Sequence, residues 1–136
     1  MSRPAITEVL ETRLGQWADA QGLLVAWDNI SFTPPSGIYL TSHDMPATPS
    51  TIDLAQNCSA HTGIYQVNVV LPAAQGRMEG MTVARHIEDL FANGTEMEGE
   101  GFVCYVTGEP AQYAGIVTPT TYTIPVSLNY RADITR

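Results

Sequence analysis

The stretch from Ser59 to Leu71 reads SAHTGIYQVNVVL and is the clearest β-strand in the chain. Alternate side chains form one apolar face: Tyr65, Val67, Val69 and Leu71. The intervening positions form a more mixed face: Ile64, Gln66, Asn68 and Val70. Because successive side chains of a strand point to opposite sides, this pattern predicts that one side packs against a core. Pro72 ends the pattern, since proline removes a backbone donor.

A second alternating strand is predicted from Thr121 to Arg131, near the end of the chain. Its buried face would consist of every second residue: Tyr122, Ile124, Val126, Leu128 and Tyr130. Pro125 lacks an N–H, so we expect it at a sheet edge or a bulge. Shorter apolar runs predict further strands at Leu23–Trp27, Ile38–Thr41, Phe102–Val106 and Tyr113–Val117.

Two amphipathic helices are predicted from apolar residues that recur at steps of three and four. The first spans Ile6 to Ala20, with Thr7 as the expected N-cap and Gly22 as the stop. The second spans Met81 to Phe91, and Asn93-Gly94 ends it.

Two segments are predicted to be loops. Residues His43 to Asn57 contain two prolines and little periodicity, and long loops in compact domains are often functional. Residues Thr95 to Gly101 are acidic and punctuated by glycine. The strands are grouped rather than alternating strictly with helices, which predicts an α+β fold. We expect one domain of residues 1–136, in which a mixed, mainly antiparallel sheet of about four to six strands carries both helices on one face.

Composition excludes several classes of protein. The 136 residues carry a net charge of −8 and include no lysine, so the basic surface of a nucleic-acid reader is missing. No apolar run approaches the ~20 residues of a membrane-spanning helix, and a soluble protein of the reducing cytoplasm is expected. Cys58 and Cys104 are far apart and predict free thiols. Only 15% of residues are charged, which fits either a surface kept for partner subunits or a polar surface rich in Ser and Thr.

No catalytic or metal-binding pattern emerges, so we expect no enzyme activity and no cofactor. His43, His61 and His86 lack metal-ligand spacing, and no nucleophile motif is present. Asp28 and Asn29 stand beside no histidine or second carboxylate at a set spacing. We therefore interpret the stretch WDNISFTPPSGIYL as architecture, in which aromatic side chains join two strands across the Pro34-Pro35 corner: Trp27, Phe32 and Tyr39.

A set of spaced residues points to a known family. The first part is a W-x-N-x-x-F-x-P-P motif at Trp27, Asn29, Phe32, Pro34 and Pro35. The others are the strand from Gly63 to Val69, the helix ending at Leu90-Phe91, and the closing Pro125-Val126-x-Leu128-x-Tyr130-Arg131. In this order, over Ile6 to Arg131, the chain resembles the small tail terminator, or tail completion, proteins of long-tailed bacteriophages and prophages.

This resemblance implies a structural role in the virion tail, reached after assembly in the host cytoplasm. The family forms a ring, typically a hexamer, on the last layer of the tail tube, and some members stay monomeric until then. The implied partners are further copies of the chain, the tail tube protein and a head-neck connector protein, while DNA passes through without specific binding. Alternatives are another head–tail connector or stopper, or a small ligand-binding or enzymatic α+β domain.

Candidate assembly-interface residues lie in the predicted loops and at the proline of the last strand. They are His43, Asp44 and Asp53 in the first loop, Glu96, Glu98 and Glu100 in the second, and Pro125. An acidic ring would repel the phosphates of passing DNA. We therefore expect the three glutamates to face either the bore of the ring or the tube.

Overall fold

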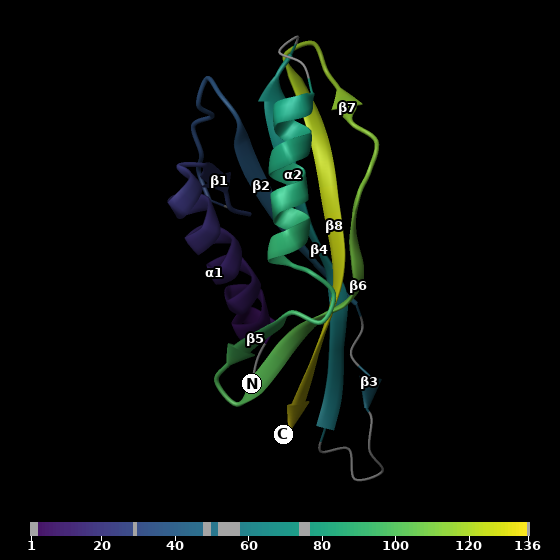
Figure 1. The fold of residues 1–136 in the computed structure, drawn as a ribbon. Coiled ribbons are helices and arrows are strands. Elements are labelled where there is room, and N and C mark those ends of the chain that lie inside the picture. Colours follow the sequence, from purple (N-terminus) through teal and green to yellow (C-terminus); the bar gives the residue numbers. More distant parts are fainter. Residues whose placement is uncertain (1–2, 29, 48–49, 52–57, 74–76, 136) are drawn as a thin grey trace.

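The computed structural model describes residues 3–28, 30–47, 50–51, 58–73 and 77–135. Within these residues two helices cover one face of a curled, mixed and mostly antiparallel sheet, as Figure 1 shows. The strands follow the order β1-β2-β4-β8-β6-β5, and two short strands extend this path, β3 beside β4 and β7 beside β8. The predicted α+β class is therefore confirmed.

The bounds of the elements follow the chain. The helices are α1 (Arg3–Gln21) and α2 (Met78–Leu90). The first four strands are β1 (Leu24–Ala26), β2 (Tyr39–Pro46), β3 (Ser50–Thr51) and β4 (Cys58–Pro72). The last four are β5 (Glu96–Gly99), β6 (Phe102–Gln112), β7 (Ile116–Val117) and β8 (Thr121–Thr135).

The two long strands β4 and β8 form the centre of the sheet. They pair antiparallel over their whole length, from Cys58 opposite Thr135 to Pro72 opposite Thr121. β2 and β3 follow the free side of β4, while β6 and β7 follow the free side of β8. The parallel pair in the described sheet is β1 with β2.

The core lies between the sheet and the two helices. The alternating residues predicted in β4 and β8 are buried, including Tyr65, Val67 and Leu128. α1 contributes Ile6, Leu10 and Leu14 to the same cluster, and α2 contributes Ala84 and Ile87. The Tyr65 and Phe91 rings meet edge to face with centroids 5.7 Å apart, an arrangement that aromatic pairs favour.

Glycine is required where β4 passes close to its neighbours. A Cβ atom on Gly63 would lie 2.5 Å from the Tyr130 hydroxyl oxygen and 2.8 Å from the Met45 carbonyl oxygen. Both distances are too short for real atoms, and the carbonyl belongs to the backbone of β2. The close packing of β2, β4 and β8 therefore depends on the missing side chain at this position.

The first helix begins earlier than predicted. α1 starts at Arg3, so Thr7 lies inside the helix and the predicted N-cap is wrong. Pro4 explains the earlier start, because proline is well suited to the first turn of a helix. The predicted stop is confirmed: Gly22 has a positive φ of 72°, and the Leu23 N–H donates to the Ala18 carbonyl at 2.9 Å.

The two predicted loops are partly strands. β2 continues to Pro46 and β3 occupies Ser50–Thr51, while Asp53 and its neighbours at 52–57 lie outside the described residues. In β2 the buried Ser42 hides the apolar alternation. In the second segment β5 forms a hairpin with β6, and a single buried residue, Met97, marks its inner face.

Pro125 does not lie at an edge strand. It is buried in β8, between β4 on one side and β6 with β7 on the other. Its carbonyl accepts a hydrogen bond from the Tyr113 N–H at 2.9 Å, in the interval between the end of β6 and the start of β7. The sheet tolerates the missing N–H of Pro125 because the irregularity lies in the neighbouring segment between β6 and β7, and not in β8 itself.

Candidate functional site

The face of the sheet turned away from the helices carries a row of polar side chains. On β2 and β4, register places Thr41 opposite Asn68 and His43 opposite Gln66. The neighbouring Ser42 lies opposite Val67 and points into the core, because side chains alternate along a strand. This polar row carries several side-chain hydrogen bonds.

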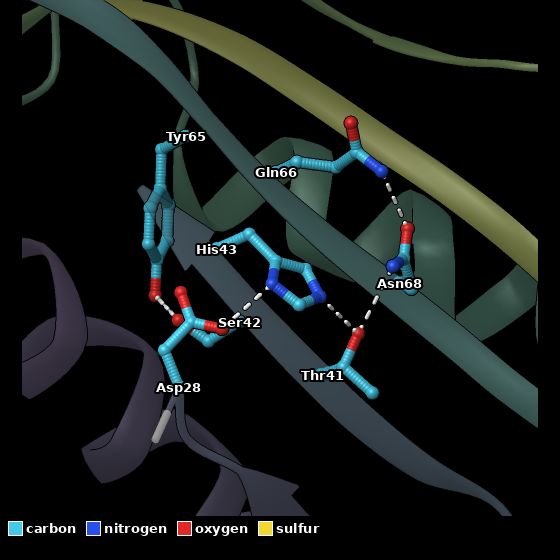
Figure 2. Close-up of polar contacts among 7 residues, drawn as sticks. All are labelled: Asp28, Thr41, Ser42, His43, Tyr65, Gln66 and Asn68. Carbon is cyan, nitrogen blue, oxygen red and sulfur yellow. Dashed lines mark hydrogen bonds and ion pairs between the residues drawn. The ribbon is translucent and has the colours of Figure 1, made fainter. Parts of the chain in front are cut away.

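Five residues of this face form one hydrogen-bonded chain, drawn in Figure 2. Gln66 Nε2 donates to Asn68 Oδ1 at 2.9 Å, and Asn68 Nδ2 donates to Thr41 Oγ1 at 3.0 Å. His43 Nε2 lies 3.2 Å from Thr41 Oγ1, and His43 Nδ1 lies 2.8 Å from Asp28 Oδ1. When the His43 imidazole is neutral and carries its proton on Nδ1, each residue of this hydrogen-bonded row donates to the next one, in the direction from Gln66 to Asp28.

The parallel pairing of β1 and β2 creates the contact between Asp28 and His43. Ala26 is opposite Thr41 in the register, so Asp28, two residues further along, reaches His43. This pair is hidden in the sequence, because no histidine stands near Asp28 along the chain. Only a predicted parallel register between β1 and β2 would have revealed the contact between Asp28 and His43.

The order carboxylate, imidazole and hydroxyl invites comparison with a catalytic relay. The Asp28 and His43 side chains are 54% and 41% exposed, however, so water weakens their mutual attraction. The Thr41 hydroxyl is already held by the Asn68 amide. No group of three potential metal ligands is found among the residues that the structure describes. We infer that this row of hydrogen-bonded side chains holds β1, β2 and β4 against one another.

A second set of polar contacts lies on the helix side. Asp44 accepts hydrogen bonds from the Thr7 hydroxyl and from the Tyr130 hydroxyl, both at 2.6 Å. Ser42 and Tyr65 are joined by a buried hydroxyl pair at 2.6 Å, and burial raises the pKa of Tyr65. Asp44 therefore joins α1, β2 and β8, and it points away from the face on which its neighbour His43 lies.

The structure brings together the three predicted glutamates. Glu96 and Glu98 are exposed on β5, and Glu100 is exposed in the turn to β6. They line a groove of about 570 Å³ between α1 and β5, which Glu8 and Arg13 also line. Arg13 Nε donates to the Leu90 carbonyl at 2.8 Å. This end of the molecule is therefore acidic, because four glutamates and one arginine line the groove.

Burial makes a further acid on α1 less acidic than usual. Burial of Glu11, with smaller effects from the negative charges of Asp28 and Asp44, raises the pKa of its carboxyl above the ordinary 4.5. Ionisation of Glu11 therefore lowers stability slightly near neutral pH, chiefly because burial removes water from its carboxylate and to a smaller extent because Asp28 and Asp44 repel it.

The predicted site residues thus separate into different places. The three glutamates lie together, His43 and Asp44 lie on opposite faces of β2, Pro125 is buried, and Asp53 lies outside the described residues. Exposed apolar side chains, which the sequence analysis did not single out, mark the sides of the sheet: Leu24 in β1, and Tyr113, Ile116 and Val117 in and before β7. No described helix is long and apolar enough to cross a membrane.

Comparisons with known proteins show what this chain is similar to. The sequence profile of the phage tail terminator protein family matches residues 5–130. No curated protein sequence matches the chain. A solved protein structure without a functional name is 34% identical, covers 97% of this chain and 96% of its own, and superimposes with a TM-score of 0.83.

A second solved structure shares the fold at lower identity. It belongs to the virion of a native gene transfer agent particle, with 14% identity, 96% coverage of both chains and a TM-score of 0.68. At this identity the likeness concerns the fold alone. The family match spans nearly the whole chain, and the chain therefore belongs to the phage tail terminator protein family, a family of structural proteins of the phage tail.

Proposed function

We propose that this protein closes into a ring on the last layer of the tail tube, ends tube polymerisation and provides the joint to the head–neck complex. The observation that carries the proposal is the family match over residues 5–130. The ring would consist of copies of this chain, typically six, and its other partners would be the tail tube protein and a head-neck connector protein.

The shape of the molecule supports a ring. In a closed ring each subunit uses one surface to meet a different surface of its neighbour. The sheet of this protein has two unlike sides, β1 at one edge and β7 with β5 at the other. The helices cover only one face, so the two edges stay open for neighbours (Figure 1).

The acidic end supports a second part of the proposal. Glu96, Glu98 and Glu100 lie together on one hairpin of a chain with net charge −8. Repeated around a ring, these carboxylates would form an acidic band facing the bore or the tube. Like charge would keep passing DNA from adhering, since phosphates and carboxylates repel each other.

Tail length tests the proposed function. The gene for this chain is removed from the phage or prophage that carries it, and the tails are measured by electron microscopy. Without a terminator, tube subunits continue to add, so we expect overlong tubes that lack heads. Tails of normal length together with heads that lose their DNA would instead assign the chain to a stopper or connector role.

A further inference from the structure

The two lateral edges of the sheet lie at the same height. One row of paired residues crosses the sheet from β1 to β7, and its members are Leu24, Tyr39, Val70, Thr123 and Ile116. The row begins at one edge and ends at the other. A neighbouring copy at the same level would therefore bring its β1 edge beside the β7 edge of this copy.

Both edges are open. Within the described residues β1 pairs only with β2, and β7 pairs only with β8. Their side chains are apolar and exposed: Leu24 by 53%, Ile116 by 55% and Val117 by 76%. Proteins usually protect edge strands with charges or prolines, because an open edge can pair with another chain. Neither β1 nor β7 carries such a residue.

The distribution of charge selects a second copy of the chain as the occupant. Residues 20–27 and 110–130 contain no Asp, Glu, Lys or Arg, although the whole chain has a net charge of −8. Copies of an acidic protein repel each other, so close approach is least costly where both surfaces are neutral. The acidic hairpin with Glu96 and Glu98 lies at the other end of β6.

The directions of β1 and β7 also suit a contact between neighbouring copies. β7 is antiparallel to β8, β8 to β4 and β4 to β2, while β1 is parallel to β2. β1 and β7 of one chain therefore run in opposite directions. Copies related by rotation about an axis along the strands keep these directions, so β7 of one copy would meet β1 of the next as an antiparallel pair.

We propose that β7 of one copy pairs with β1 of the next, so that the sheet continues from subunit to subunit around the ring. This inference rests on the proposed function, which supplies the ring. The short strand pair fixes the register of neighbouring copies. Exposed Ile30, which follows β1, and exposed Tyr113, which precedes β7, add apolar surface beside it.

A charge swap tests the pairing. Leu24→Glu or Ile116→Lys alone places a charge against an apolar strand of the next copy, where it loses water without gaining a partner. The double variant places Glu and Lys on opposite sides of the same seam, where opposite charges attract. Each variant is supplied to the phage from which the gene was removed, and tail lengths and infectious particles are counted.

Ile64→Lys is the matched control. Ile64 is 39% exposed and lies in the central strand β4, between β2 and β8, away from both proposed edges and from the acidic hairpin. We expect each single variant to fold, because all three substituted side chains are exposed. Thermal unfolding of each purified variant checks this. The control is expected to restore tail length fully.

The expected result is at least a tenfold loss of infectious particles, with overlong tails, for each single variant, and recovery with the double variant. Full activity of either single variant would overturn the pairing. A folded double variant that fails like the single ones would overturn it too. Failure of the proposed function is distinguishable, because removing the gene would then leave tails of normal length.

Discussion

Asp44 connects three elements through one side chain. Its backbone belongs to β2, and its carboxylate accepts hydrogen bonds from Thr7 of α1 and Tyr130 of β8. Hydrogen bonds to charged groups contribute about 1.5–3 kcal/mol each, and their partners here are partly buried. We predict that Asp44→Ala lowers the free energy of unfolding by about 2–4 kcal/mol. Denaturant unfolding monitored by circular dichroism measures this loss.

Asp89→Ala is the control for that prediction. Asp89 forms an exposed i,i+4 ion pair with Arg85, and such pairs contribute less than about 0.5 kcal/mol. Equal losses for the two variants would contradict the role assigned to Asp44. From the sequence alone Asp44 is expected in an assembly loop, because nothing along the chain indicates partners that lie 37 and 86 residues away.

Glu11 gives a pH-dependent prediction. A carboxyl whose pKa is raised in the folded state binds its proton more tightly there than in the unfolded chain. Stability is therefore lost as pH rises above the ordinary value of 4.5 through the raised pKa of Glu11. We predict that Glu11→Gln raises the melting temperature at pH 7 and that the gain disappears at pH 4. An equal gain at both pH values would exclude this electrostatic origin.

At the scale of elements, the packing of β2, β4 and β8 depends on Gly63. A methyl group there would collide with the Tyr130 hydroxyl and with a backbone carbonyl that cannot move alone. We predict that Gly63→Ala costs about 1–3 kcal/mol, the usual range for overpacking. Gly37→Ala is the control, because a Cβ at Gly37 meets nothing within 4 Å. If the two variants unfold at the same denaturant concentration, the close approach is not a constraint.

The elements also show how far sequence reasoning reaches. Alternation in β4 and β8 predicted the central strands, because one face of each is almost wholly apolar. The same rule missed the length of β2, since Ser42 and Asp44 face the helices and satisfy their polar groups there. It missed β5 because only Met97 faces the core. The Asp28–His43 contact stayed hidden because it depends on a parallel register between β1 and β2.

At the scale of the whole molecule, the acidic hairpin is predicted to face the bore or the tube. Replacing Glu96, Glu98 and Glu100 with lysine would create a basic band that attracts DNA or disturbs the contact with the tube. We expect fewer infectious particles and abnormal tail lengths. Replacing Glu79, Glu88 and Asp89 of α2 with lysine changes the net charge equally and serves as the control. Unchanged tail length and infectivity for the first set would count against this orientation.

The central claim is that this protein stops the growth of the tail tube. Its most direct measurement follows purified tube subunits as they polymerise with and without the purified protein, with tube lengths read by electron microscopy. We predict that added protein shortens the tubes in proportion to its concentration and sits at one end of each. Tubes that reach the same length in both samples, with the protein absent from their ends, would contradict the account.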